Sequence, residues 1–560
     1  MEKLPNLGEI KMKKKIIRFI TIILSIITCI SFVGCNKPGS GANAEDTIYV
    51  YNYNGGFGTQ WLYRARDAYQ KLHPDVKINI NPQKPITSLS SSDIKVGRDE
   101  LWFIEMSSYY TYWADGALES ISPAVTTPNP YDGGKTVVSK LTDTQDAFYK
   151  INGEYFAIPH YSGYMGLIYN VDTFEDNGFY FTKNKPTVPY EEDPDGYFTK
   201  NSEDYSAGPD GEFGTYDDGL PATYDDFLNL LDYMSQNGFV KSKGKSPLIS
   251  TGAANEQYIG ETLYSFMVDY EGIDQMKLNF TFDGQATDLG KIVNGQFVKD
   301  ANPTTITAQN GYELSRQQGK YEAFNFFNEI FSDYKNYDNS VMASSTFKSR
   351  DAVRRLIRGE AGILMEGCWW EEENLGLFSQ LNKDKHDFRF AVMPFPKATE
   401  DKIGEKSTIY DHNASICFMK SGLSDAKKEM IYDFIQFLYS DEWLIDFTAT
   451  TGTRKALNYD IPESALNNLT HYEKTLVDFY SKSDILYPGS ANKLYYNNQA
   501  STFRSYYYMT SKINDENLHP ITYLVDYRIN GKYKNPSSTT YFNGLYDYYS
   551  SIWPGLVSVL

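Results

Sequence analysis

Apolar and polar residues alternate along the first part of the chain in the order strand, helix, strand. Residues 46–53 predict a β-strand, residues 61–72 have helical periodicity, and residues 76–80 alternate as a second strand. Residues 101–105 predict another strand and residues 109–117 a helix. Strands and helices at this spacing predict a parallel α/β unit.

The alternation continues through the middle of the chain. Residues 153–159 form an extended segment closed by proline, and residues 167–170 predict a buried strand. A helix over 173–177 follows, with Asp172 as its expected cap. This order extends the α/β pattern.

The second half of the chain shows the same helix and strand periodicities. Residues 346–358 predict a helix that ends at Gly359, a residue type favoured just after helices. The other expected elements are the helices 224–237 (with Thr223 as N-cap), 425–440 and 443–449, and the strands 361–365 and 388–392. The chain has no internal repeat, and its 560 residues can hold two or three domains, so we expect an α/β protein of more than one domain.

The amino terminus has the pattern of an export signal. Basic residues precede the apolar run 19–33, and Gly34 and Cys35 follow. The run is shorter than the ~20 residues that a transmembrane helix needs. A small residue followed by cysteine resembles the lipobox of bacterial lipoproteins, which implies a signal peptide over 1–34, a lipid on Cys35 and a flexible tether over 35–45. The alternative is a plain signal peptide with an incidental cysteine.

Composition narrows the classes of function. The 560 residues include 41% hydrophobic and 22% charged residues, which is typical of a globular protein. A net charge of −19 opposes binding to nucleic acids. Aromatic residues make up 16% of the chain, and rings with polar tips suit ligands with both polar and apolar faces. Cys368 and Cys417 are the cysteines of the body of the chain, and they either form a disulfide or remain two buried thiols.

Four stretches, in this order, resemble the extracellular solute-binding proteins of ABC importers, and most closely their maltose-binding-protein-like carbohydrate-binding family. The stretches are 153–159 with 166–170 and Phe174, 221–227, 347–369, and 434–440 with Thr451-Gly452. Together they cover roughly residues 46–460. Each stretch alone is weak, but their joint order behind a lipobox is specific.

This resemblance implies a two-lobed, periplasmic-binding-protein-like α/β fold with a hinge and a ligand cleft between the lobes. The implied lobes are 46–158 with 394–445, and 159–393 with 446–560. Such lobes close on a ligand without covalent chemistry. The implied partners are a carbohydrate, the ABC permease subunits and the membrane at its extracellular face, and the expected protein is a monomer that needs no cofactor.

The resemblance also places the ligand against loops that combine aromatic and polar side chains, as sugar recognition requires. The family commonly faces a sugar with a tryptophan at the position of Trp369, and Trp370 could take that role, since adjacent strand residues face opposite sides. Residues 371–373 are expected to be a solvated helix start. The predicted ligand-binding residues are Tyr53, Asn54, Phe57, Tyr161, Tyr164, Glu366, Trp369 and Trp370.

An acidic insertion over 180–221 departs from the family pattern. Its acidic residues cluster around glycine turns, and calcium favours six to eight oxygen ligands, although EF-hand spacing is absent. A structural calcium ion and a solvated acidic loop are the two interpretations. The residues that would hold the ion are Asp193, Asp195, Asp210, Glu212, Asp217 and Asp218.

Two other functions compete with sugar capture. An extracellular glycoside hydrolase needs two carboxylates across a cleft, and Glu366 and Asp411 could supply them, although no local motif supports the pair. A binding protein of the same fold could instead take a peptide or another non-sugar solute. The sequence predicts oligosaccharide capture ahead of both.

Overall fold

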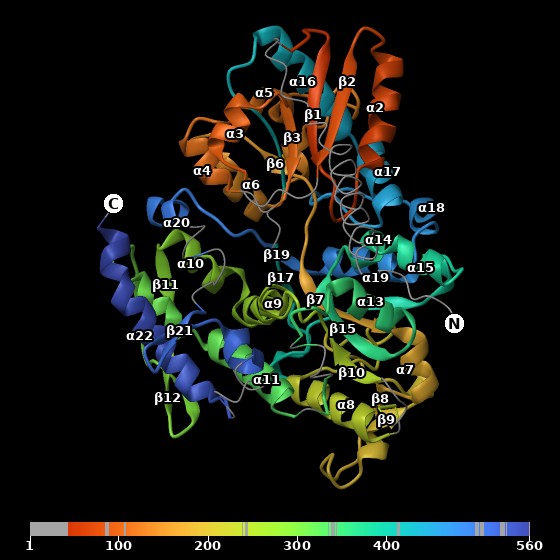
Figure 1. Cartoon of the computed structure of the whole chain (residues 1–560), viewed down its shortest axis with the longest axis vertical. Helices are drawn as coiled ribbons and strands as arrows, with labels where there is room; N and C mark the ends of the chain where they lie inside the picture. Colours follow the sequence, from red (N-terminus) through yellow and green to blue (C-terminus); the bar gives the residue numbers. More distant parts are fainter. Residues whose placement is uncertain are drawn as a thin grey trace, which may run out of the picture. The chain divides into compact units, whose positions relative to one another are not determined.

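Two mixed β-sheets, each flanked by helices, organise the chain (Figure 1). The chain divides into two compact units, Met1–Glu45 and Asp46–Leu560, and both sheets belong to the second. This computed structural model describes residues 43–83, 89–105, 108–237, 239–240, 245–333, 335–337, 342, 344–411, 415–498, 503, 509–526, 533 and 535–558. Cys35 and the predicted signal peptide lie outside the described residues.

The first sheet has the strand order β2-β1-β3-β18-β6. Its strands are β2 (Lys77–Gln83), β1 (Thr47–Tyr53), β3 (Leu101–Ile104), β18 (Ile416–Met419) and β6 (Ile158–Pro159). The first three run parallel, and β18 is antiparallel to both of its neighbours. Helix α16 (Asp425–Leu438) packs on β1, and α2 (Gln60–Leu72) packs on β2. The Trp61 ring of α2 lies 5.1 Å from Phe103 of β3, and the Tyr69 ring lies 4.8 Å from Phe434 of α16. This sheet and its helices are called the first lobe.

The second sheet has the order β10-β15-β7-β16. Its strands are β10 (Ser246–Ile249), β15 (Ala361–Gly367), β7 (Met165–Asn170) and β16 (Phe390–Met393). All of their residues are buried, because helices cover the sheet. The covering helices include α9 (Asn255–Met276), α13 (Ser349–Ile357) and α19 (His471–Lys482). This sheet and its helices are called the second lobe.

The chain passes between the two sheets at the loop from β6 to β7, between β16 and β18, and between α17 (Asp441–Thr451) and α19. Near these crossings β17 (Thr408–Tyr410) pairs in parallel with β19 (Asp484–Leu486), and α9 packs on both. Segments that cross between lobes form a hinge. The two-lobed α/β fold predicted from the sequence is therefore confirmed.

The last residues of the chain join a subdomain built around α11 (Gln318–Ser332). Helix α22 (Ser538–Val557) packs on α11, β20 and η4, and its Trp553 ring lies 5.6 Å from that of Phe282. The smaller elements of this part are α10 (Leu278–Thr281), β11 (Gly284–Ala286), β12 (Gly290–Val293), β13 (Gln296–Lys299), β14 (Thr304–Ile306), η4 (Gly311–Arg316), α20 (Lys493–Asn498), β20 (Ser511–Ile513), β21 (Glu516–Leu518) and η8 (Thr522–Asp526).

The acidic insertion is ordered by aromatic packing. Phe198 stacks on Tyr233 at 4.0 Å between ring centroids, and Tyr180 stacks on Tyr205 at 4.4 Å. These rings bury apolar area that a polar segment of this length otherwise lacks. The elements involved are β8 (Tyr180–Phe181), η2 (Pro194–Tyr197), β9 (Phe198–Thr199), η3 (Ser202–Asp204) and α8 (Tyr224–Gln236).

Most local predictions are confirmed, and two need correction. The cap of α7 (Val171–Asn177) is Asn170, whose side chain accepts a hydrogen bond from the Thr173 amide at 2.9 Å, and not Asp172, which pairs with Arg389. Helix α13 begins at Ser349, later than the sequence predicted. The remaining elements are α3 (Ser91–Val96), α4 (Tyr109–Ala114), α5 (Ser122–Thr126), η1 (Val137–Lys140), α6 (Asp143–Tyr149), β4 (Lys150–Ile151), β5 (Glu154–Tyr155), α14 (Trp370–Glu373), α15 (Leu375–Gln380), η5 (Lys385–Asp387), η6 (Glu400–Lys402) and α18 (Glu463–Leu466).

Two further sequence questions have structural answers. Cys368 and Cys417 are both buried free thiols. Among the described residues, no helix is both long enough and apolar enough to cross a bilayer.

Candidate ligand-binding site

The loop between β1 and α2 forms one wall of the site. The Thr59 hydroxyl donates to Asn54 Oδ1 at 2.6 Å, and the Asn52 side chain donates to Thr59 Oγ1 at 2.9 Å, so the loop is shaped by its own polar groups. The Tyr53 ring lies over Gly55, where a Cβ atom would come within 2.3 Å of the phenolic oxygen. The missing Cβ of Gly55 leaves room for this ring, and Tyr53 is partly exposed at the loop surface.

The end of β15 forms the facing wall in the second lobe. Glu366 is 2% exposed, and its carboxylate accepts hydrogen bonds from Ser349 Oγ at 2.6 Å and from the Gly367 amide at 3.1 Å. Burial, helped by the nearby charge of Glu373, outweighs these two hydrogen bonds, which lower the pKa, and raises the pKa of Glu366 to about 8. The site therefore holds a carboxyl that titrates near neutral pH.

A hydrogen bond joins the two walls at Gly56. Its amide donates to Glu373 Oε1 of α14 at 2.9 Å. A Cβ atom placed on Gly56 would lie 2.9 Å from the Tyr161 hydroxyl and 3.0 Å from Glu105 Oε1. Groups from the first lobe, the hinge and the second lobe thus meet around one backbone position, where φ is +55°.

The hinge contributes two of the predicted tyrosines, which have different surroundings. The Tyr161 ring lies 4.9 Å from Phe57 in an edge-to-face contact, so both predicted residues belong to the site. The Tyr161 hydroxyl has no hydrogen-bond partner among the residues that the structure describes. Tyr164 is 1% exposed and packs on Phe479 at 5.5 Å, inside the core of the second lobe.

The two predicted tryptophans also separate. Trp369 is partly exposed, and its ring covers Gly367, where a Cβ atom would lie 2.3 Å from the indole. Trp370 is 1% exposed and packs on Phe390 at 5.1 Å. The strand ends at Gly367 and Trp370 begins α14, so strand alternation does not reach these residues. Trp369 lies at the site, whereas Trp370 is a core residue.

Glu371 corrects another expectation. It was expected in a solvated helix start, but it is 3% exposed and accepts a hydrogen bond from Thr470 Oγ1 at 2.8 Å. Burial and the neighbouring charge of Glu473 raise the pKa of Glu371 to about 8. The helix does start here, but only Glu373 of the three carboxylates is exposed.

Sequence reasoning missed Glu105, Tyr258 and Glu373. Glu105 follows β3, which is parallel to β1, so the rule that ligands gather at the carboxyl ends of parallel strands would have found it. Burial raises the pKa of the Tyr258 phenol, and Glu366 and Glu373 raise it further. Tyr258 lies early in the long helix α9, where no local signal marks it.

Acidic side chains of the insertion accept hydrogen bonds from amides of their own turns. Asp193 accepts from the Gly196 amide at 3.2 Å, Asp210 from the Glu212 amide at 2.8 Å, and Asp218 from the Gly214 amide at 2.8 Å. Among the described residues, which include all six predicted calcium ligands, no group of three or more His, Cys, Asp or Glu side chains could hold a metal ion. Asp195 lies near the Tyr233 phenol, whose pKa is raised mainly by burial and further by that carboxylate.

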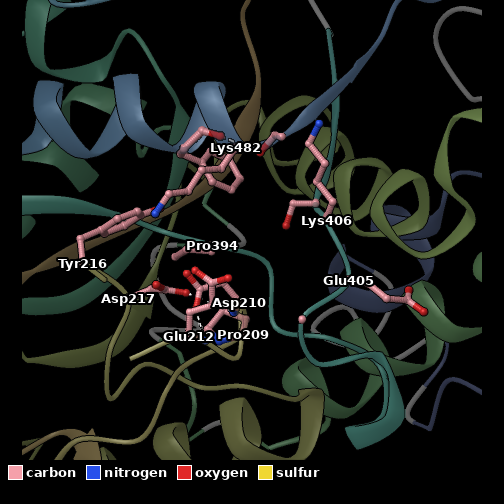
Figure 2. A pocket seen from close by; sticks show the side chains of 13 residues that line it. Pro209, Asp210, Glu212, Tyr216, Asp217, Pro394, Glu405, Lys406 and Lys482 are labelled. Carbon is pink, nitrogen blue, oxygen red and sulfur yellow. Dashed lines mark hydrogen bonds between the residues drawn. The ribbon is translucent and has the colours of Figure 1, made fainter. Parts of the chain in front are cut away.

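Asp210, Glu212 and Asp217 gather on one side of a pocket of about 280 Å³, with Lys406 on the other side (Figure 2). Asp217 is 2% exposed and accepts from Thr215 Oγ1 at 2.5 Å. Burial, followed by the charge of Asp210, raises the pKa of Asp217 to about 7. None of the predicted ligand-binding residues lines this pocket.

A buried lysine of the first lobe contacts the hinge. Lys455 is 1% exposed, and its amine lies 2.9 Å from Nδ1 of His160. The rings of Trp61, Phe447 and Tyr439 lie 4.5, 4.6 and 4.8 Å from this amine. Burial lowers the pKa of Lys455 to about 7. His160, adjacent to Tyr161, is therefore a packing residue of the hinge.

The sequence of this chain matches one protein family over most of its length. The family described as "Bacterial extracellular solute-binding protein" matches residues 64–470. No curated protein matches the chain significantly.

Solved structures are similar across nearly the whole chain. RafE from Streptococcus pneumoniae is 13% identical with a TM-score of 0.52, and the alignment covers 92% of this chain and 100% of RafE. The cyclic α-maltosyl-1,6-maltose binding protein of Arthrobacter globiformis is 12% identical, with a TM-score of 0.51 and coverage of 92% and 100%. The GacH receptor of Streptomyces glaucescens is 11% identical, with a TM-score of 0.51 and coverage of 91% and 98%. At these identities the likeness establishes the fold.

Proposed function

This chain belongs to the bacterial extracellular solute-binding protein family, and we propose that it captures an oligosaccharide between its two lobes and delivers it to an ABC importer. The family is one of extracellular binding proteins, so the activity is capture outside the cytoplasm. RafE has been solved in complex with raffinose, and GacH with acarbose, which supports a saccharide ligand for the same fold.

The observation that carries this proposal is the meeting of aromatic and carboxylate side chains at the Gly56–Glu373 hydrogen bond. The C–H faces of a sugar pack on rings, and Tyr53 and Trp369 are partly exposed here. Sugar hydroxyls require hydrogen-bond partners, which Glu105 and Glu373 supply. Since the partners belong to both lobes, bound ligand favours the arrangement in which the lobes meet.

The test is a thermal-shift and calorimetry screen of the soluble mature chain against neutral and charged oligosaccharides. At least one saccharide is expected to raise the Tm. Trp369→Ala is expected to weaken its binding roughly 10-fold, since the lost ring area corresponds to about 1–2 kcal/mol. Trp443→Ala, which truncates a partly exposed ring that packs on Phe437 in the first lobe, is the matched control and is expected to bind normally.

Two results would contradict the proposal. The first is a Tm raised only by a peptide, polyamine or other non-sugar solute. The second is release of new reducing ends from the bound saccharide, which would indicate a glycoside hydrolase instead of a binding protein.

We further propose that a lipid on Cys35 holds the monomeric protein at the extracellular face of the membrane. The support is the sequence pattern, in which the apolar run 19–33 is followed by Gly34 and Cys35. The tether 35–45 would keep the two lobes within reach of the permease. Incorporation of labelled fatty acid into the wild type but not into Cys35→Ser is the expected result.

A further inference from the structure

We infer that the captured saccharide carries a positive charge, as an amino sugar does, and that Glu105, Glu366 and Glu373 receive this charge. The inference rests on the proposed function, because it names the class of saccharide for the same site. It concerns recognition only and involves no covalent step.

The first step is the convergence of three carboxylates on one place. Glu373 accepts the Gly56 amide at 2.9 Å, and Glu105 Oε1 lies 3.0 Å from the position of a Cβ atom on that same glycine. Glu366 is the last residue but one of β15, the strand that leads to α14, and the charge of Glu373 acts on it. The three residues come from both lobes, so the negative charge is concentrated where the lobes meet.

The pKa values of two tyrosines are raised by the same carboxylates. Burial is the main cause of the raised pKa of Tyr53, and Glu105 and Glu373 raise it further. For Tyr258 the cause is again burial, followed by Glu366 and Glu373. Each phenol therefore lies close to two of the three carboxylates. Tyr53 and Tyr258 are both partly exposed, so a ligand can reach this field from solvent.

An independent observation points to a ligand in this place. Tyr161 is 4% exposed, and its hydroxyl has no hydrogen-bond partner among the described residues. That hydroxyl lies 2.9 Å from the position of a Cβ atom on Gly56, beside Glu105. A buried hydroxyl without a partner costs free energy, which a polar ligand group at this position would recover.

The spacing of the carboxylates favours an organic cation over a metal ion. No three carboxylate, imidazole or thiolate groups in the described part of the chain converge as metal coordination requires. An ammonium group carries three donors that can be shared among separated acceptors. A neutral sugar would satisfy individual oxygens but would bring no positive charge to Glu105 and Glu373, and Glu366 would keep its proton at neutral pH.

The experiment measures affinity for oligomers of glucosamine and galactosamine, each beside its N-acetylated counterpart of the same length. At pH 7 and low salt, a cationic oligomer is expected to bind at least 10-fold more tightly than its acetylated partner. The advantage should shrink as NaCl rises from about 20 to 300 mM, because salt screens exposed charges. Because Glu366 loses a proton to pair with the amine, the calorimetric enthalpy should depend on the buffer for the cationic oligomer only.

Variants assign the charge to the named residues. Glu366→Gln and the exposed Glu373→Gln are each expected to reduce the cationic advantage by 10-fold or more. Glu360→Gln makes the same chemical change just before the other end of β15 and is the matched control, expected to keep the advantage. Glu373→Gln changes an exposed side chain, so it remains testable if Glu366→Gln fails to fold.

The outcomes separate the two proposals. Equal or tighter binding of the acetylated oligomers, or an advantage unchanged in both variants, overturns the inference and leaves saccharide capture standing. Binding of neutral saccharides alone would also overturn the inference of a charged ligand and leave saccharide capture standing. A chain that binds no saccharide but binds a non-sugar solute overturns the proposed function, and this inference with it.

Discussion

Glu366→Gln should stabilise the ligand-free protein, and the gain should grow with pH. Glu366 is 2% exposed, and burial raises its pKa from the ordinary 4.5 to about 8. Between these values the folded protein retains a proton that the unfolded chain has released, so the free energy of unfolding falls as pH rises. One pKa unit corresponds to ~1.36 kcal/mol, which gives a cost of about 3 kcal/mol at pH 7 and at most about 5 kcal/mol above pH 8.

Glutamine removes this cost because it does not ionise. Its carbonyl oxygen can accept the Gly367 amide, and the Ser349 hydroxyl can rotate to accept the new amide group, so both hydrogen bonds of the wild type have replacements. The expected difference between variant and wild type is therefore near zero below pH 4.5, rises through neutral pH and is constant above pH 8.

The assay is thermal unfolding of both proteins without ligand at pH 5, 6, 7 and 8 and constant ionic strength. The Tm of Glu366→Gln is expected to exceed that of the wild type by several degrees at pH 8, on the order expected for a few kcal/mol. Glu360→Gln, which changes a partly exposed carboxylate near Arg355, is expected to show no such trend. A difference that is independent of pH, or a variant that is less stable than wild type at pH 8, would refute the reasoning.

Three further predictions follow from the surroundings of single residues. Trp370→Ala should lower the free energy of unfolding by about 3–5 kcal/mol, measured with denaturant, because it empties a packed core site, whereas Trp369→Ala should lose affinity with little change in stability. Lys455→Met should raise the Tm more at pH 6 than at pH 9.5. Burial lowers the pKa of Lys455 from 10.5 to about 7, so the free energy of unfolding of the wild type rises with pH between these values. An increase in Tm that is the same at both pH values would contradict this prediction. Cys35→Ser should move the protein from the membrane fraction to the soluble fraction on immunoblots of fractionated cells.

Local signals predicted most of the fold because caps and periodicity depend only on neighbouring residues. Thr223 accepts the Asp226 amide at the start of α8 as expected, and Gly359 adopts φ +64° after α13. The wrong cap at α7 also has a local cause. Asn and Asp are both favourable N-cap residues, so the residue type does not distinguish Asn170 from Asp172. Asn170 is the cap because β7 ends there and the helix begins at the next residue.

Sequence reasoning found residues of the candidate site only in segments that directly follow a β-strand with a clear hydrophobic pattern. Tyr53, Phe57 and Tyr161 meet this condition and lie around the loop that follows β1. Glu366 and Trp369 meet it at the end of β15. The prediction that Trp370 could face the ligand was wrong, because the end of a strand cannot be located to a single residue from the sequence, and Trp370 lies in the core. Tyr258 belongs to a helix whose distance from the loops depends on tertiary packing, which no local pattern contains.

The concentration of negative charge also explains why closure should depend on ligand. When the lobes meet at Gly56, Glu105 of the first lobe approaches Glu373 of the second, whose charge also acts on Glu366. Like charges brought together in a partly buried place repel, so the meeting of the lobes is opposed when the site is empty. A ligand changes this balance only through contacts that differ between the open and closed arrangements. A cation between these carboxylates makes such contacts with both lobes at once and replaces repulsion by attraction. Burial makes ionised Glu366 costly in the empty site, and a cation bound beside it would offset that cost, so Glu366→Gln should raise stability and weaken capture together.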